Sequence, residues 1–138
     1  MADEHVVPIR SEADIMAARH RGRELAASLG FSQTDLTLVV TAISELARNI
    51  LQYAGQGEVL LRIAEEDGRR GIAIEARDQG PGIDDVERAL QDGYSTSGSL
   101  GLGLPGARRL LDEFEVRSEP GKGTVVTGKK WANSGVRR

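Results

Sequence analysis

The sequence predicts an α+β fold, a two-layer sandwich in which helices cover one face of a mixed, mostly antiparallel sheet. Two observations predict it. Segments with helical periodicity follow capping signals in the first half, and short alternating apolar segments come in pairs joined by turns. Because hairpins and helices are mixed along only 138 residues, we expect one domain over residues 1–132 and a flexible tail over residues 133–138.

Two amphipathic helices are expected near the N-terminus, after a short edge strand over residues 5–9. Ser11 and Asp14 form a capping pattern that opens the first helix. Ser32 opens the second and longer helix, which ends near Gly55. Opposite its apolar stripe, the long helix carries polar residues three and four apart, namely Thr41, Glu45, Asn49 and Gln52.

Strands are expected in two pairs. Residues 59–63 and 72–76 alternate apolar and polar side chains, with a turn over residues 67–71 between them. The closing pair covers residues 114–116 and 123–126. These four segments and the N-terminal edge strand account for the sheet.

The run from Asp78 to Gly106 holds seven of the 17 glycines, and this density suggests backbone that turns sharply or approaches a bound group. We expect it to fold over a nucleotide. It is expected to contain a short helix near residues 86–90, a lid over residues 92–100, and a helix from Pro105 whose free amides attract phosphate. Its GxGxxG pattern follows a polar segment rather than an apolar strand, so a Rossmann fold is rejected.

Composition excludes several functions. The net charge of −3 and the isoelectric point near 5.4 argue against nucleic-acid binding. The chain has no cysteine, so disulfides and thiolate metal sites are excluded. The sequence shows no signal-peptide pattern and no apolar run long enough to span a membrane. A cytoplasmic protein without membrane contact is therefore expected.

The polar residues near the glycines suggest phosphoryl transfer. Asp78 ends a strand, and its carboxylate accepts hydrogen bonds only, which suits the amine of adenine. The Asn49 side-chain oxygen could bind Mg²⁺, and Glu45, one turn earlier, could act as a base. The Thr124 hydroxyl either lies near the base of the nucleotide, or Thr124 is simply a β-branched strand residue. The polar stripe of the long helix, taken alone, is also typical of an ordinary exposed helix. Three arginines are candidates for phosphate contact, namely Arg48, Arg108 and Arg109.

Four short motifs occur in order: Glu45-x-x-x-Asn49, Asp78-x-Gly80-x-Gly82, Gly101-x-Gly103 and Gly123-Thr124. Together they resemble the boxes of the GHKL ATPase superfamily, which has the Bergerat fold. The resemblance implies ATP and Mg²⁺ as cofactors, Glu45 as the catalytic base and Asn49 as the metal ligand. The nucleotide-binding set that it implies is Asn49, Asp78, Gly80, Gly82, Ile83, Gly98, Gly101, Leu102, Gly103 and Thr124.

The resemblance extends over nearly the whole chain to the RsbT-type switch serine/threonine kinases of the bacterial stressosome, in the runs TAISELARNILQYAG, DQGPGI, DGYSTSGSLGLGLPGARRLLDEF and GKGTVV. It implies a kinase that phosphorylates STAS-domain proteins and, when released, activates a PP2C-type phosphatase by partner switching. A nucleotide-dependent anti-sigma factor that sequesters a sigma subunit is the alternative. A metabolic ATPase subdomain is disfavoured, because no second domain carries a substrate.

Overall fold

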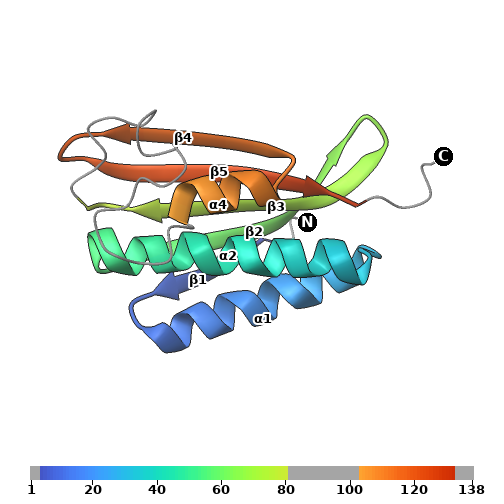
Figure 1. Ribbon diagram of the computed structural model, residues 1–138, viewed down its shortest axis with the longest axis horizontal. Coiled ribbons are helices and arrows are strands. Elements are labelled where there is room, and N and C mark those ends of the chain that lie inside the picture. The colour runs from blue at the N-terminus through green and yellow to red at the C-terminus, as the bar shows by residue number, and fades with distance from the viewer. Residues whose placement is uncertain (1–3, 81–102, 133–138) are drawn as a thin grey trace.

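The computed structural model describes residues 4–80 and 103–132, which form three helices on one face of a five-stranded sheet (Figure 1). The expected α+β sandwich is confirmed. The short helix expected near residues 86–90, the lid over residues 92–100 and the tail over residues 133–138 lie outside the described residues. The elements are β1 (His5–Ile9), α1 (Glu12–Ser28), α2 (Gln33–Ala54), β2 (Gly57–Glu66), β3 (Arg69–Asp78), α4 (Gly103–Leu110), β4 (Glu113–Glu119) and β5 (Gly123–Trp131).

The strand order is β1-β2-β3-β5-β4, and each of these neighbouring pairs is antiparallel. β1 lies at an edge, as expected from Pro8, because proline cannot donate a hydrogen bond to a second neighbouring strand. β3 lies in the middle, between the long strands β2 and β5. The position of its last residue, Asp78, is therefore held by strands on both sides.

The turn between β2 and β3 is tighter than the sequence analysis expected. Only Asp67 and Gly68 lie outside the two strands, and both have positive φ, at 52° and 79°. The expected turn over residues 67–71 is therefore wrong in extent, since Gly71 pairs with Ala64 inside the sheet. An Asp-Gly pair adopts the left-handed backbone of a two-residue hairpin at little cost, so the strands continue to the turn.

The expected caps fix both long helices. The Asp14 carboxylate accepts hydrogen bonds from the backbone N–H groups of Arg10, at 2.8 Å, and Ser11, at 3.1 Å. The Ser32 hydroxyl accepts one from the N–H of Asp35 at 3.0 Å. The first two N–H groups lie just before α1, and the third lies in the first turn of α2, where no carbonyl of the helix can accept from it. The starts of α1 and α2 therefore lie where the capping patterns predicted.

The main core lies between the helices and the sheet. Figure 1 shows α1, α2 and α4 in one layer in front of the strands. Ile43 of α2 is fully buried, and Gly22 of α1 lies so close to it that a Cβ at residue 22 would overlap the Ile43 Cδ1 atom. The sheet contributes alternate side chains to this core, among them Val59, Leu61, Ile72, Ile74, Ala76 and Val126.

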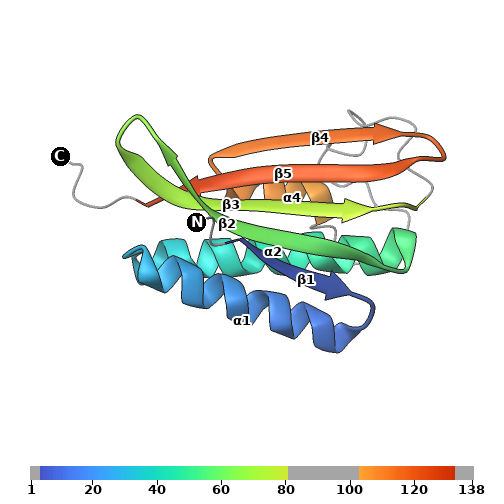
Figure 2. The same cartoon turned by 180° about the vertical axis from the view of Figure 1, so that it is seen from behind.

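Figure 2 shows the other face of the sheet, behind the helices. Trp131 packs there with Ala64 and Ala73. The Arg69 guanidinium lies 4.2 Å from the centre of the indole ring, and the indole N–H donates a 3.0 Å hydrogen bond to Glu113. We call this surface the open face, because no described helix covers it.

Lys130 ties the helical layer to the sheet at the start of α2. Its ammonium lies 3.4 Å from the Asp112 carboxylate and 4.0 Å from that of Asp35. Asp112 also accepts a 2.8 Å hydrogen bond from the backbone N–H of Trp131. This cluster closes one end of the sandwich, and the predicted site residues lie toward the other end of α2.

Candidate nucleotide site

Four residues form a row across the strand ends that lie beside the C-terminal end of α2, namely Gly57, Asp78, Thr124 and Ser118. Asp78 pairs with Gly57 on one side and Thr124 on the other, and Thr124 pairs with Ser118. Directly paired residues project from the same face of a sheet. Because Asp78 has the same alternation as the core residues Ile74 and Ala76, this row faces the helices.

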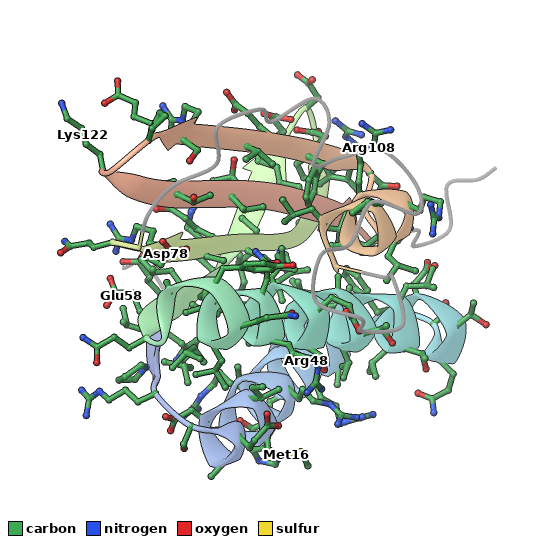
Figure 3. All side chains as sticks on the ribbon, turned by 60° about the vertical axis from the view of Figure 1, so that its left-hand side comes forward. Met16, Arg48, Glu58, Asp78, Arg108 and Lys122 are labelled. Atoms are coloured by element: carbon green, nitrogen blue, oxygen red, sulfur yellow. The ribbon has the colours of Figure 1, made fainter. Side chains whose placement is uncertain are left out.

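Asp78 keeps one carboxylate oxygen available. Its Oδ1 atom accepts a 2.8 Å hydrogen bond from the N–H of Gly80 two residues later, which fixes the side chain. Its Oδ2 atom has no hydrogen-bond partner within residues 4–80 and 103–132. Figure 3 shows Asp78 at the end of its strand, beside the last turns of α2. An oriented carboxylate with one unused acceptor suits a ligand that donates a hydrogen bond.

Glycines allow α2 to pack closely on this row. A Cβ at Gly80 would lie 2.6 Å from the Cβ of Ala54, and one at Gly57 would lie 2.8 Å from the Cγ2 of Ile50. Real Cβ atoms do not approach other atoms so closely. The C-terminal turns of α2 therefore contact the backbone on both sides of Asp78, and a side chain at either glycine would push the helix away.

Glu45 and Asn49 lie on the same helix, and both are half-buried. Asn49 lies about 100° around α2 from Ile50, which contacts Gly57, and Glu45 lies about one turn before Asn49. Neither side chain has a hydrogen-bond partner among the residues that the structure describes. Half-buried polar groups without protein partners are available to a ligand, a metal ion or water.

The other predicted residues are only partly placed. Gly103 is the first residue of α4. Five predicted residues lie outside the described part of the chain, namely Gly82, Ile83, Gly98, Gly101 and Leu102. Arg48 points toward α1, where its Nη1 atom lies 3.4 Å from Glu12 Oε1. Figure 3 shows Arg108 well apart from Asp78. Phosphate contacts by these two arginines therefore stay predictions.

The side-chain oxygen of Asn49 suits a metal ion that also binds phosphate oxygens of the nucleotide. Among the described residues, no group of three or more His, Cys, Asp or Glu side chains could hold a metal ion. Asn49 offers one amide oxygen. Mg²⁺ usually takes one or two protein oxygens and completes its shell with water and substrate phosphate oxygens. The single oxygen of Asn49 is compatible with that mode of binding.

Sequence reasoning missed Ser118. Thr124 is only 6% exposed, and its Oγ1 atom lies 3.0 Å from Ser118 Oγ. Ser118 also donates a 3.0 Å hydrogen bond to the Gly123 carbonyl oxygen. The spacing contains the signal, because a tight turn centred on residue 121 places residues 118 and 124 opposite each other.

A hollow on the open face is a poor candidate for the nucleotide. Leu60 and Ala73 lie in it, and Arg62, Glu75 and Lys129 are among the charged residues around it. Lys129 lies 3.6 Å from Glu66, and Glu75 lies 3.4 Å from Arg77, so several of its charges are already paired. It is separated by the sheet from the row that contains Asp78.

Among the described residues, no helix combines the length and the apolar character needed to cross a membrane.

The family model of histidine kinase-like ATPase domains matches residues 8–130 of the chain. The matched segment contains every predicted site residue.

Two curated relatives are informative. The chain is 50% identical over 131 residues to the serine/threonine-protein kinase RsbT of Bacillus subtilis, and the alignment covers 95% of this chain and 98% of that protein. It is 32% identical over 113 residues to an anti-sigma F factor of Thermoanaerobacter sp., with 79% of each chain covered. A relative named as a serine/threonine-protein kinase and one named as an anti-sigma factor therefore both align with most of the chain.

A solved structure supports the fold. The RsbU and RsbW domains of Rv1364c from Mycobacterium tuberculosis match with a TM-score of 0.63 and 20% sequence identity. The match covers 92% of this chain and 32% of that one, so the chain spans about a third of that longer protein. At this identity the likeness concerns the fold alone.

Proposed function

Because the chain belongs to the family of histidine kinase-like ATPase domains, we propose that it is an ATP- and Mg²⁺-dependent serine/threonine-protein kinase that works by partner switching. The observation that carries the proposal is the juxtaposition at one end of the sheet. Asp78 and Thr124 are neighbours there, and α2 packs against the same row through Ile50 and Ala54. Both halves of a nucleotide would therefore find suitable groups, the base at the strand ends and the phosphates along α2.

Asp78 would recognise the base. Its Oδ2 atom would accept a hydrogen bond from the 6-amino group of adenine, while the Gly80 N–H holds Oδ1. A keto oxygen at the same place would face a carboxylate that cannot donate. Adenine nucleotides are therefore favoured over those with a keto group.

Glu45 and Asn49 would act on the phosphates. Asn49 would supply one oxygen to Mg²⁺, which offsets the negative charge of the phosphates when it is bound. Glu45 would take the proton from the attacking serine or threonine hydroxyl, the role of a general base. The first amides of α4, which begins at Gly103, would bind a phosphate oxygen.

The proposed protein substrates are STAS-domain regulators, and the second proposed partner is a PP2C-type phosphatase that the released kinase activates. The support is the extended similarity to a serine/threonine-protein kinase together with the half-buried Glu45. A stressosome pathway in the cytoplasm is the proposed setting.

Phosphate transfer from ATP to a purified STAS-domain protein tests the proposal. We expect Glu45→Gln and Asn49→Ala to lower the rate of phosphorylation by at least about 100-fold, the lower range for loss of a general base. Glu24→Gln removes a charge from the exposed side of α1, and it should phosphorylate at the wild-type rate. Undiminished transfer by both α2 variants would contradict the assignment.

The similarity to anti-sigma F factors favours one alternative, a nucleotide-dependent anti-sigma factor that acts mainly by sequestration. Purified sigma subunits, STAS proteins and PP2C phosphatases can be compared as binding partners. Tight binding of a sigma subunit without phosphorylation of any STAS protein would favour this alternative.

A further inference from the structure

The hydrogen-bond direction between Ser118 and Thr124 suggests how the site selects its base. Resting on the proposed ATP site, we propose that Ser118 is a positioning residue that determines base specificity. Its Oγ atom accepts the hydrogen bond that the Thr124 hydroxyl donates, so Thr124, like Asp78, can only accept hydrogen bonds from the nucleotide.

The Gly123 carbonyl fixes the orientation of the Ser118 hydroxyl. A carbonyl oxygen only accepts, so the single hydroxyl proton of Ser118 lies in the 3.0 Å bond to Gly123. Ser118 then has only lone pairs to offer to Thr124. The 3.0 Å contact between the two hydroxyls is therefore donated by Thr124.

The consequence for a ligand follows from the row of strand ends. Thr124 is directly opposite Asp78, and side chains in such pairs have Cβ atoms about 5 Å apart. The Thr124 lone pairs and the Asp78 Oδ2 atom thus form two neighbouring acceptors. The 6-amino group of adenine carries two N–H donors, whereas the 6-keto group of hypoxanthine carries none.

The burial of Thr124 strengthens this selection. The residue is only 6% exposed, so water has little access to relieve an acceptor placed against a keto oxygen. A buried acceptor that is left without a donor costs free energy. A site built around a hydrogen bond therefore rejects an analogue that lacks the donor group. Ser118, which sequence reasoning missed, would thus set the polarity of the row.

The test compares ATP with inosine triphosphate, which has a keto group in place of the 6-amino group. Isothermal titration gives the dissociation constant of each nucleotide, with Mg²⁺ present, for wild type, Ser118→Ala and Ser118→Thr. In Ser118→Ala the Thr124 hydroxyl loses its acceptor, so it can rotate and donate its hydrogen bond to a keto oxygen. We expect the ratio of the inosine triphosphate constant to the ATP constant to fall about tenfold, the worth of about one net hydrogen bond.

Ser118→Thr keeps the hydroxyl, and its ratio should stay within about twofold of the wild-type ratio. Both nucleotides are measured on one preparation, so a loss of folded protein cancels in the ratio. An unchanged ratio in Ser118→Ala would overturn the proposal, as would an equal fall in Ser118→Thr. Thr124→Val removes the acceptor itself and provides a second check, because it too should lower the ratio.

The proposed function can fail separately. Wild-type protein that binds neither nucleotide would overturn the ATP site and the role of Ser118 with it. Wild-type protein that prefers ATP, combined with an unchanged ratio in Ser118→Ala, would overturn only the role of Ser118.

Discussion

Replacing Asp78 by asparagine tests base recognition with little change to the fold. The asparagine Oδ1 atom can still accept the 2.8 Å hydrogen bond from the Gly80 N–H, so the side chain should keep its orientation. The Oδ2 atom becomes an NH₂ group, which donates and therefore opposes the adenine amine. The substitution thus removes one charge-assisted acceptor from the row and adds a donor.

The expected loss follows from that single bond. A hydrogen bond to a charged group contributes about 1.5–3 kcal/mol, which corresponds to an increase of about 10- to 150-fold in the dissociation constant of ATP. At an ATP concentration about 100 times the wild-type constant, ligand binding stabilises the wild type by about 2.7 kcal/mol. The same concentration should stabilise Asp78→Asn by only about 0.3–1.4 kcal/mol.

Thermal unfolding with and without ATP and Mg²⁺ measures this difference. For a chain of 138 residues, about 1 kcal/mol corresponds to about 3 °C in Tm, so the ATP-dependent rise should fall from about 8 °C to about 1–4 °C. Glu115→Gln removes a carboxylate from the open face and is the matched control. An ATP-dependent rise in Asp78→Asn equal to that of the wild type would refute the reasoning.

Three further substitutions test the packing. Gly123→Ala should lower both Tm and ATP affinity, because residue 123 has a φ of +92° and its Cβ would overlap the Asp78 carbonyl oxygen; an unchanged Tm would contradict this. Ile43→Ala should cost about 2–5 kcal/mol in urea unfolding, since the side chain is fully buried. Lys130→Met should cost about 1–2 kcal/mol, because Asp112 loses its ammonium partner; the same free energy of unfolding in both proteins would show that the pair is neutral.

Local signals predicted the secondary structure well. Capping residues and apolar periodicity depend on neighbours a few positions away, so Ser11, Asp14 and Ser32 placed the starts of α1 and α2 correctly. The strand ends were harder to place. Charged residues such as Arg69 and Arg70 look like loop residues, yet they extend β3 because their side chains project toward solvent and pair with Glu66 and Glu65.

Most contacts between distant segments could not be predicted from the sequence. Asp78 and Thr124 are 46 positions apart, and only the register between β3 and β5 makes them neighbours. The motifs suggested that both serve one site. The spacing around the turn at residue 121 places Ser118 opposite Thr124, but the direction of the hydrogen bond between them required the structure. The glycines at residues 57 and 80 were visible in the sequence, whereas their contacts with Ile50 and Ala54 required the packed helix.

The position of Trp131 has a practical consequence for optical experiments. It is the chain's one tryptophan, and it lies at the end of β5 opposite Thr124, on the far side of the sheet from Asp78. Its fluorescence should change when the sandwich comes apart, because the indole would lose Arg69 and Glu113 as neighbours. The intrinsic emission therefore serves as a reporter of unfolding, whereas following nucleotide occupancy calls for a labelled nucleotide or a dye attached near the end of α2.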